Sequence, residues 1–209
     1  MSERKNISIS GMASLKGGTY GNVSISGSGK VNGDMDVEKM SVSGTVSIDG
    51  NLDANKINIS GNSKVNGYVK SDEIVLAGAF KCTSKVECEI FNCNGTFDVR
   101  DMLNAESIKV EVSGRCSVSE IGCQSIQVKK GSSKGFLKGI FGNKKVGISD
   151  PKLVVDIIEG DDIEVENIIA KIVRGKNVTI GEGCDIQVVE YMENISINDK
   201  SNIREKNKI

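Results

Sequence analysis

The sequence repeats itself, and the repeat settles at a constant length of seventeen residues. Residues 6–11 (Asn-Ile-Ser-Ile-Ser-Gly) return sixteen residues later as residues 22–27 (Asn-Val-Ser-Ile-Ser-Gly), and the spacing is then seventeen. One column of the repeat holds only glycine: Gly27, Gly44, Gly61, Gly78 and Gly95. Self-similarity at a fixed period of this size indicates a repeat architecture, in which each unit packs against the next.

Apolar residues occupy the same places in successive units and alternate there with polar ones. This alternation has a period of two, which predicts strands with one buried face. The apolar columns are Val23, Met40, Ile57, Ile74, Phe91, Ile108; Ile25, Val42, Ile59, Leu76, Cys93, Val110; Val31, Ile48, Val65, Cys82, Val99; and Met35, Leu52, Val69, Val86, Leu103. A further column holds mostly small residues: Val37, Ala54, Ser71, Cys88 and Ala105.

Strands of about three to five residues cannot bury a face alone, but stacked at a fixed period they cover one another. Seventeen residues divide into three short strands and three corners, and glycine and asparagine suit such tight corners. The sequence therefore predicts an all-β fold, a three-sided β-helix (β-solenoid) with about 17 residues per coil. A β-sandwich would have no reason to keep so strict a period.

The repeat also divides the chain. We expect about seven coils over residues 7–128, with a slip of one or two residues between Val110 and Cys123. An insertion over residues 129–152 interrupts the pattern. Val155, Ile172 and Val189 are then seventeen apart, as are Ile163, Ile180 and Ile197, which predicts some three further coils over residues 153–198. Residues 199–209 are charged and lack apolar alternation, so we expect a frayed tail.

Composition excludes several functional classes. The chain has no histidine, so it lacks the usual general base and the residue of Ser-His-Asp and Cys-His catalysis. Its 27 basic and 28 acidic residues nearly balance, which argues against nucleic acid as a general partner. Because no apolar run resembles a signal peptide or a membrane span, we expect a cytoplasmic protein whose six cysteines are reduced.

The chain offers few candidates for chemistry. Cys82 and Cys93 fall in apolar columns and Cys88 in the small one, while the phases of Cys116 and Cys123 are less certain. The spacings between cysteines are not those of zinc sites, so core packing is the favoured interpretation over metal or redox chemistry.

Two other segments invite a functional interpretation and do not sustain it. Residues 131–135 (Gly-Ser-Ser-Lys-Gly) lack the spacing of a phosphate-binding loop. Asp161, Asp162, Glu164 and Glu166 alternate with apolar residues, which favours a solvated strand face over a cation site. We therefore expect no catalytic residues, no cofactor and no metal.

The insertion is basic and partly apolar. It contains seven lysines and one aspartate, together with two phenylalanines. Lysines around an apolar wedge suit an anionic membrane surface, although the apolar residues could instead pack on the solenoid or on a neighbouring subunit. The candidate membrane contacts are Lys134, Phe136, Leu137, Lys138, Ile140, Phe141, Lys144 and Lys145.

The two ends of the solenoid are candidate interfaces. A solenoid that stays monomeric needs polar caps, because open strand edges over an apolar core promote the addition of another subunit. The first coil begins with apolar residues and the last predicted coil ends with them. The candidate polymer-interface residues are Ile7, Ile9, Leu15, Ile195 and Ile197.

The repeated unit Val-x-Ile-x-Gly-x-x-x-Val-x-Gly-x-Val/Leu, kept over about 120 residues, resembles the bactofilins, which are bacterial polymer-forming cytoskeletal proteins. Residues 158–163, 173–184 and 188–191 resemble the C-terminal half of longer members found in Gram-positive bacteria. The resemblance implies a right-handed, three-sided β-helix that polymerises end to end without nucleotide. It also implies a scaffold, often beside the inner membrane, for envelope, cell-shape or motility processes and for the proteins recruited to them.

Other functions remain open alongside the scaffold. Residues 177–186 resemble the hexapeptide coils of left-handed β-helix acyltransferases, and polysaccharide-active enzymes also use right-handed β-helices. Those acyltransferases usually rely on a histidine base, which this chain lacks. A monomeric adaptor is the third alternative, since fold alone does not decide function.

Overall fold

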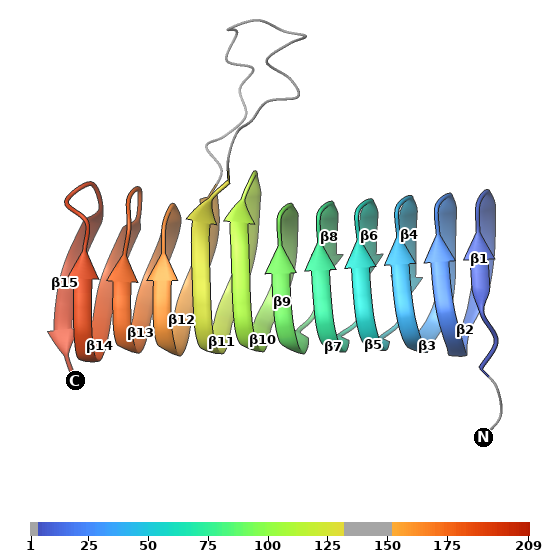
Figure 1. Cartoon of the computed structure of the whole chain (residues 1–209), viewed down its shortest axis with the longest axis horizontal. Coiled ribbons are helices and arrows are strands. Elements are labelled where there is room, and N and C mark those ends of the chain that lie inside the picture. The colour runs from blue at the N-terminus through green and yellow to red at the C-terminus, as the bar shows by residue number, and fades with distance from the viewer. Residues whose placement is uncertain (1–3, 132–151) are drawn as a thin grey trace, which may run out of the picture.

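The chain winds into a straight rod of stacked coils (Figure 1). The structure, a computed structural model, describes residues 4–131 and 152–209. Among these residues it contains strands and no helix, arranged as a parallel β-solenoid of about 11 coils with ~17 residues per coil. The predicted fold class is confirmed.

The fifteen strands pair side by side in one parallel sheet that wraps around the rod. The strands of the first coils are β1 (Ile7–Ile9), β2 (Met12–Ile25), β3 (Ser28–Val42), β4 (Thr45–Asp49), β5 (Leu52–Ile59), β6 (Asn62–Val65), β7 (Val69–Leu76), β8 (Ala79–Cys82) and β9 (Val86–Cys93). The later strands are β10 (Thr96–Val112), β11 (Arg115–Lys130), β12 (Lys152–Val165), β13 (Ile168–Ile180), β14 (Asp185–Ile197) and β15 (Asn202–Lys208).

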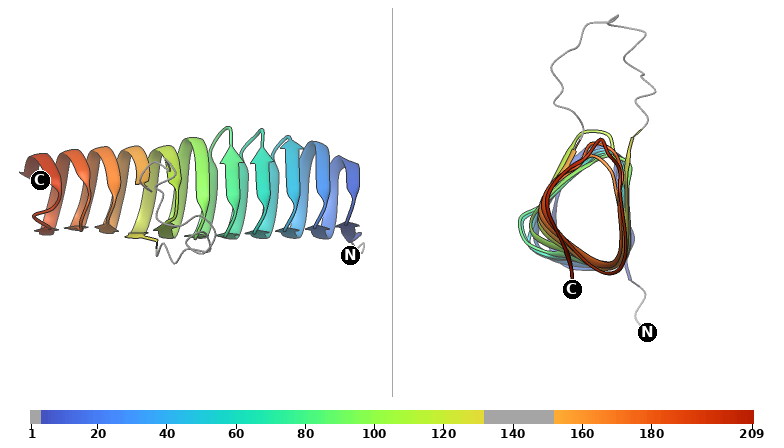
Figure 2. Two further views of the ribbon diagram at one scale, coloured as in Figure 1. Left: turned by 90° about the horizontal axis from the view of Figure 1, so that it is seen from above. Right: turned by 90° about the vertical axis from the view of Figure 1, so that its left-hand side faces the viewer.

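Each coil has three sides, which Figure 2 shows in the view along the rod. In the coil that begins at Thr45, β4 forms the first side, and the two halves of β5 form the second and third sides. The near strands in Figure 1 rise while the chain advances from its N-terminus toward the left, so the winding is right-handed.

The core is a set of continuous ladders inside the rod. On the third side Met40 pairs with Ile57, Ile57 with Ile74, and Ile74 with Phe91, and all four side chains are fully buried. The other predicted columns between Val23 and Val110 stack in the same way, with the small-residue column on the second side. The predicted slip is present as well: Val99 pairs with Val118 and Val110 with Val128, and a bulge follows Val99.

The predicted columns of the last coils are wrong. Val155 stacks on Ala170 rather than on Ile172, and Ile163 stacks on Val178 rather than on Ile180. Ile172 instead faces outward and is half-exposed.

The reason is a loss of residues at two corners of this coil. Ile48 and Leu52, the last core residue of one side and the first of the next, are four positions apart. The equivalent Val155 and Ile158 are three apart. The corner between β12 and β13 is also short, which brings the coil from Val155 to Ala170 to fifteen residues.

The expectation of a frayed tail is also wrong. Asn202–Lys208 form β15, which pairs in parallel with Asp185–Tyr191 of β14. Ile203 is half-buried on Ile186, and backbone pairing continues to Ile209, whose N–H donates to the carbonyl of Tyr191 at 3.0 Å. Backbone hydrogen bonds do not depend on apolar alternation. The charged side chains of this segment lack that alternation, so the sequence did not predict the strand.

Candidate functional site

The N-terminal end of the rod exposes an open strand edge. β1 supplies the third side of the first coil and pairs with Val23–Ile25 of β2. Among residues 4–131 and 152–209, no other strand pairs with β1. Ile9 is buried, whereas Ile7 and Leu15 are half-buried and pack against the core. Ile7 and Ile9 begin the two ladders of the third side, and Leu15 begins a ladder of the first side.

The C-terminal end leaves a matching gap on the third side. β15 covers the first and second sides of β14 only, up to Tyr191. Within the described part of the chain, nothing pairs with the outer edge of Asn194–Ile197. Ile195 is half-buried there, and Ile197 is 36% exposed.

The five predicted interface residues thus fall into two groups at opposite ends of the rod (Figure 1). Sequence reasoning missed Ile203, which lies on the C-terminal end face over Ile186. A signal for it exists, because the Asp185-Ile186 pair returns seventeen residues later as Asn202-Ile203.

The eight predicted membrane-contact residues cannot be placed in the same way. Lys134, Phe136, Leu137, Lys138, Ile140, Phe141, Lys144 and Lys145 lie outside the described residues. Of the predicted insertion, Lys129 and Lys130 end β11 and Lys152 begins β12. Three lysines of the insertion therefore sit on the rod itself, at the corner between the third and first sides.

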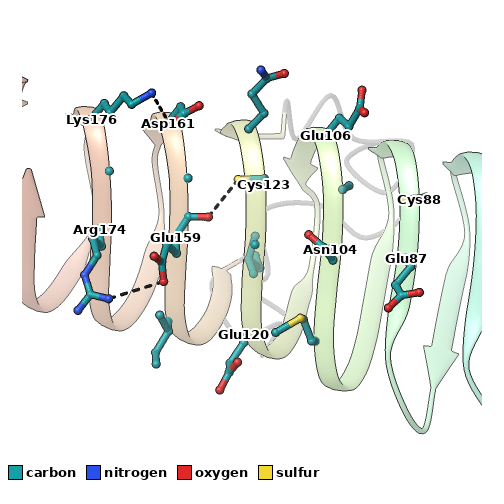
Figure 3. A pocket seen from close by; sticks show the side chains of 18 of the residues that line it. Glu87, Cys88, Asn104, Glu106, Glu120, Cys123, Glu159, Asp161, Arg174 and Lys176 are labelled. Carbon is teal, nitrogen blue, oxygen red and sulfur yellow. Dashed lines mark hydrogen bonds and ion pairs between the residues drawn. The ribbon is translucent and has the colours of Figure 1, made fainter. Parts of the chain in front are cut away.

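A hollow of about 1070 Å³ lies along the small-residue ladder of the second side (Figure 3). Its floor includes Cys88, Ala105, Cys123, Gly160 and Gly175, because small side chains leave the surface recessed. The carboxylates at its rim include Glu87, Glu106, Glu120, Glu159 and Asp161.

The basic groups in this hollow are already paired with neighbouring acids. Arg174 Nε lies 2.6 Å from Glu190 Oε2, and its Nη1 lies 3.6 Å from Glu159 Oε2. Lys176 Nζ lies 3.0 Å from Asp161 Oδ1 (Figure 3). The hydrogen bond to Glu190 and the charge of that carboxylate raise the pKa of Arg174. These contacts tie adjacent coils together.

The thiols in the hollow are not activated. Burial raises the pKa of Cys88 to about 12, and burial followed by the charge of Asp161 raises that of Cys123 to about 12. The Cys123 thiol donates to the Glu159 carbonyl at 3.7 Å. Because the thiolate is the reactive form of cysteine, both groups are poor nucleophiles near neutral pH.

The remaining cysteines pack in the core. Cys82 and Cys93 are buried in the apolar ladders as expected, and all six cysteines are free thiols. Cys116 and Cys184, whose places the repeat did not settle, are buried in the ladder of the first side that contains Phe97 and Leu153.

The acidic cluster faces outward and binds neighbouring coils. Asp162 accepts from the Asn177 side chain at 2.8 Å, and Glu164 accepts from that of Gln127 at 2.6 Å. Over the described ranges, no three His, Cys, Asp or Glu side chains converge as metal ligands. Nor do those ranges contain a helix long and apolar enough to cross a membrane.

Comparisons with known proteins connect this geometry to a family. Residues 1–80 match the family model described as "Bactofilin: Polymer-forming cytoskeletal", which confirms the resemblance over that part of the chain. Two proteins of Bacillus subtilis (strain 168) are similar. The uncharacterized protein YhbF is 40% identical over 109 residues, which are 52% of this chain and 42% of YhbF. The uncharacterized protein YhbE is 34% identical over 112 residues, 53% of this chain and 44% of YhbE.

The matched segments thus span less than half of either relative. No solved structure matches the chain. The family description is structural rather than catalytic.

Proposed function

From the match of residues 1–80 to the polymer-forming bactofilins, we propose that this chain is a cytoskeletal protein whose rods join end to end into filaments without nucleotide. The observation that carries the proposal is the pair of open edges, β1 at one end and Asn194–Ile197 at the other.

These edges provide both parts of a joint. Unpaired N–H and C=O groups favour the addition of a strand. Burial of the neighbouring isoleucines by a second subunit lowers the free energy, because it removes them from water. Contacts between ends of this kind do not close on themselves, so they produce filaments rather than rings.

The test places a charge at each edge. Ile197→Lys changes a side chain that is already 36% exposed, so the rod should remain folded while filaments are lost. Ile9→Lys changes a buried side chain of the first coil, so it should leave the middle coils folded while filaments are lost. Ile169→Lys is the matched control, because Ile169 is 39% exposed on the first side, where β14 and β15 lie between it and the C-terminal end. Electron microscopy without nucleotide, with circular dichroism as a check of folding, gives the readout.

Normal filaments from folded Ile197→Lys and Ile9→Lys would refute assembly through these edges. Loss of filaments in the Ile169→Lys control would show that any added charge disrupts assembly, which would equally refute the assignment.

We further propose that the filament lies in the cytoplasm beside the inner face of the membrane, where it supports envelope, cell-shape or motility processes. Lys129, Lys130 and Lys152 place positive charge at the corner between β11 and β12. Residues 132–151 add four lysines and an apolar group that includes Phe136 and Phe141, a composition suited to anionic lipid.

Co-sedimentation with liposomes tests this attachment. Binding to anionic vesicles should fall with added salt and fall again when Phe136 and Phe141 become Ser, while filaments persist. One filament carries many copies of residues 132–151, so weak contacts of single copies with the membrane would together give strong binding. Equal binding to neutral vesicles, or undiminished binding after deletion of residues 132–145, would rule out the membrane contact.

A further inference from the structure

The first and second sides of the rod carry opposite charge. Parallel stacking keeps each outward position at the same place on successive coils, so a bias in the repeat becomes a charged surface. On the first side, Lys30, Lys64 and Lys81 belong to one outward ladder, which also contains Ser47 and Asp98. On the second side, Asp36, Asp53 and Glu87 belong to one outward ladder.

Ion pairs within the first side engage three of its acidic groups, while Asp185 has no ion-pair partner among the described residues. Lys30 Nζ lies 3.1 Å from Asp49, Lys81 Nζ 2.5 Å from Asp98, and Lys171 Nζ 2.9 Å from Asp156. The cations of this side without an ion-pair partner among the described residues include Lys16, Lys64, Arg100, Arg115, Lys152 and Arg204.

The second side shows the reverse arrangement. Lys85 pairs with Glu87 at 2.7 Å, while Arg174 and Lys176 pair with the acids of the hollow described above. Lys70, Lys206 and Lys208 are cations of this side outside these pairs. The carboxylates without an ion-pair partner in the described part of the chain include Asp53 and Glu120 on this side, and Glu38, Asp72, Glu89 and Glu106 at its corner with the third side.

The third side has little net charge. Its outward positions are rich in serine and asparagine, and two of its lysines are paired, Lys56 with Glu73 at 2.5 Å and Lys129 with Glu164 at 3.7 Å. Lys39 and Lys109 also lie on this side, and both are exposed.

We propose that the first side of one copy lies along the second side of another, so that rods associate side by side through charge. Both surfaces are built from parallel strands with the same spacing of about 4.8 Å, so opposite charges can meet repeatedly along the rod. A second copy of the chain can pair with the charges of both sides, whereas an anionic membrane would bind only the basic first side.

This contact is separate from the joint between ends. Exposed ion pairs are individually weak, but repetition along rods and filaments makes them act together. Their strength depends on salt, because the screening length is about 10 Å at 0.1 M ionic strength.

Charge reversal tests the pairing. Lys64→Glu with Arg115→Glu makes the first side less basic, and Glu89→Lys with Glu106→Lys makes the second side less acidic at its corner with the third side. Lys39→Glu with Lys109→Glu is the matched control, since it changes net charge as the first variant does but on the third side. Filament width in electron micrographs and low-speed pelleting, at 50 mM and 500 mM NaCl, report lateral association.

We expect wild type and control to form bundles at 50 mM NaCl and to lose them at 500 mM. Each reversed variant should form single filaments at both salt concentrations. A mixture of the two reversed variants should form bundles again, because each supplies the charge that the other lacks. Filament length in the same images reports end-to-end assembly, so failure of one contact is distinguishable from failure of the other.

Several results would overturn the proposal. They are bundles that persist in either reversed variant, loss of bundles in the control, and failure of the mixture to restore them. Wild-type filaments that stay single at 50 mM NaCl, but bind anionic vesicles through Lys64 and Arg115, would assign the first side to a membrane instead.

Discussion

Two buried serines of the inner ladders differ in whether their hydroxyl groups form hydrogen bonds. Ser63 and Ser71 are both 5% exposed. The Ser71 hydroxyl donates to the carbonyls of Asn55 and Glu73, at 3.2 Å and 3.0 Å. The Ser63 hydroxyl has no hydrogen-bond partner among the described residues, and its ladder neighbours are Val46 and Phe80. Burial of a polar group is costly when it is unpaired.

Alanine substitutions at these serines should therefore have opposite signs. Ser63→Ala removes an unpaired hydroxyl and should raise the free energy of unfolding by about 1 kcal/mol. Ser71→Ala removes a bonded one and should lower it by about 1 kcal/mol. Urea unfolding of both variants measures the difference, and a shared sign would contradict the hydrogen-bond assignment.

The cysteines of the hollow predict a loss of stability at alkaline pH. Burial raises the pKa of Cys88 and Cys123 to about 12 from the ordinary thiol value of 9.0. Above pH 9 the unfolded chain loses these protons while the folded chain keeps them, so the free energy of unfolding falls as pH rises toward 12. Below pH 8 they contribute no pH dependence.

Replacement of both cysteines by alanine isolates this effect from other titrating groups. The double variant should show a shallower decline of unfolding free energy between pH 9 and 11 than wild type. Equal slopes would mean that these thiols titrate normally in the folded rod.

At the scale of strands and corners, the corner between β12 and β13 depends on one residue. Asn167 has φ 53°, the left-handed region that asparagine tolerates better than most residues. Asn167→Val should lower the free energy of unfolding by about 1–3 kcal/mol because a β-branched side chain is strained there. Asn167→Gly is the control and should cost less. If the midpoint temperature of thermal unfolding is lower for the glycine variant than for the valine variant, the Asn167 side chain matters rather than the backbone angle.

Corners also decide how far the fold could be predicted from the sequence. Coils up to Val99 keep one corner length, so the seventeen-residue columns match the ladders there. In the coil from Val155 to Ala170 two corners are shorter, and nothing in the alternation marks the loss. Ile172 fitted the period by coincidence, because the outward ladder of Ile157, Ile172 and Val188 is also apolar.

The candidate site was predictable where apolar residues marked it. Ile7, Ile9 and Leu15 are apolar and begin their ladders, so the first end could be found. The last coil was missed because β15 is charged. Apart from the return of Asp185-Ile186 as Asn202-Ile203, its strand pairing depends on backbone groups that carry no sequence signal. The opposed charges of the first and second sides became visible only once the register assigned each residue to a side.

For the whole molecule, the solenoid continues across the insertion. β11 and β12 pair from Arg115–Lys152 through Val128–Val165, as neighbouring coils do elsewhere. Replacement of residues 130–151 by one glycine gives Val-Lys-Gly-Lys-Leu, the same length as the corner from Val42 to Val46. We expect one cooperative urea transition with a midpoint near that of wild type. Two separate transitions would show that the coils before and after the insertion do not form one folding unit.

Parallel winding has a consequence for how the chain can be synthesised. Each coil pairs only with its neighbours, so the distance in sequence between partners stays near seventeen residues however long the rod becomes. A chain emerging from the ribosome can therefore wind in the order of its translation, each coil templating the next. The step from Arg115 to Lys152 spans 37 residues, the longest between paired strands among the described residues. Because loop closure costs about 0.6 kcal/mol more for each doubling of length, we expect winding to be slowest there.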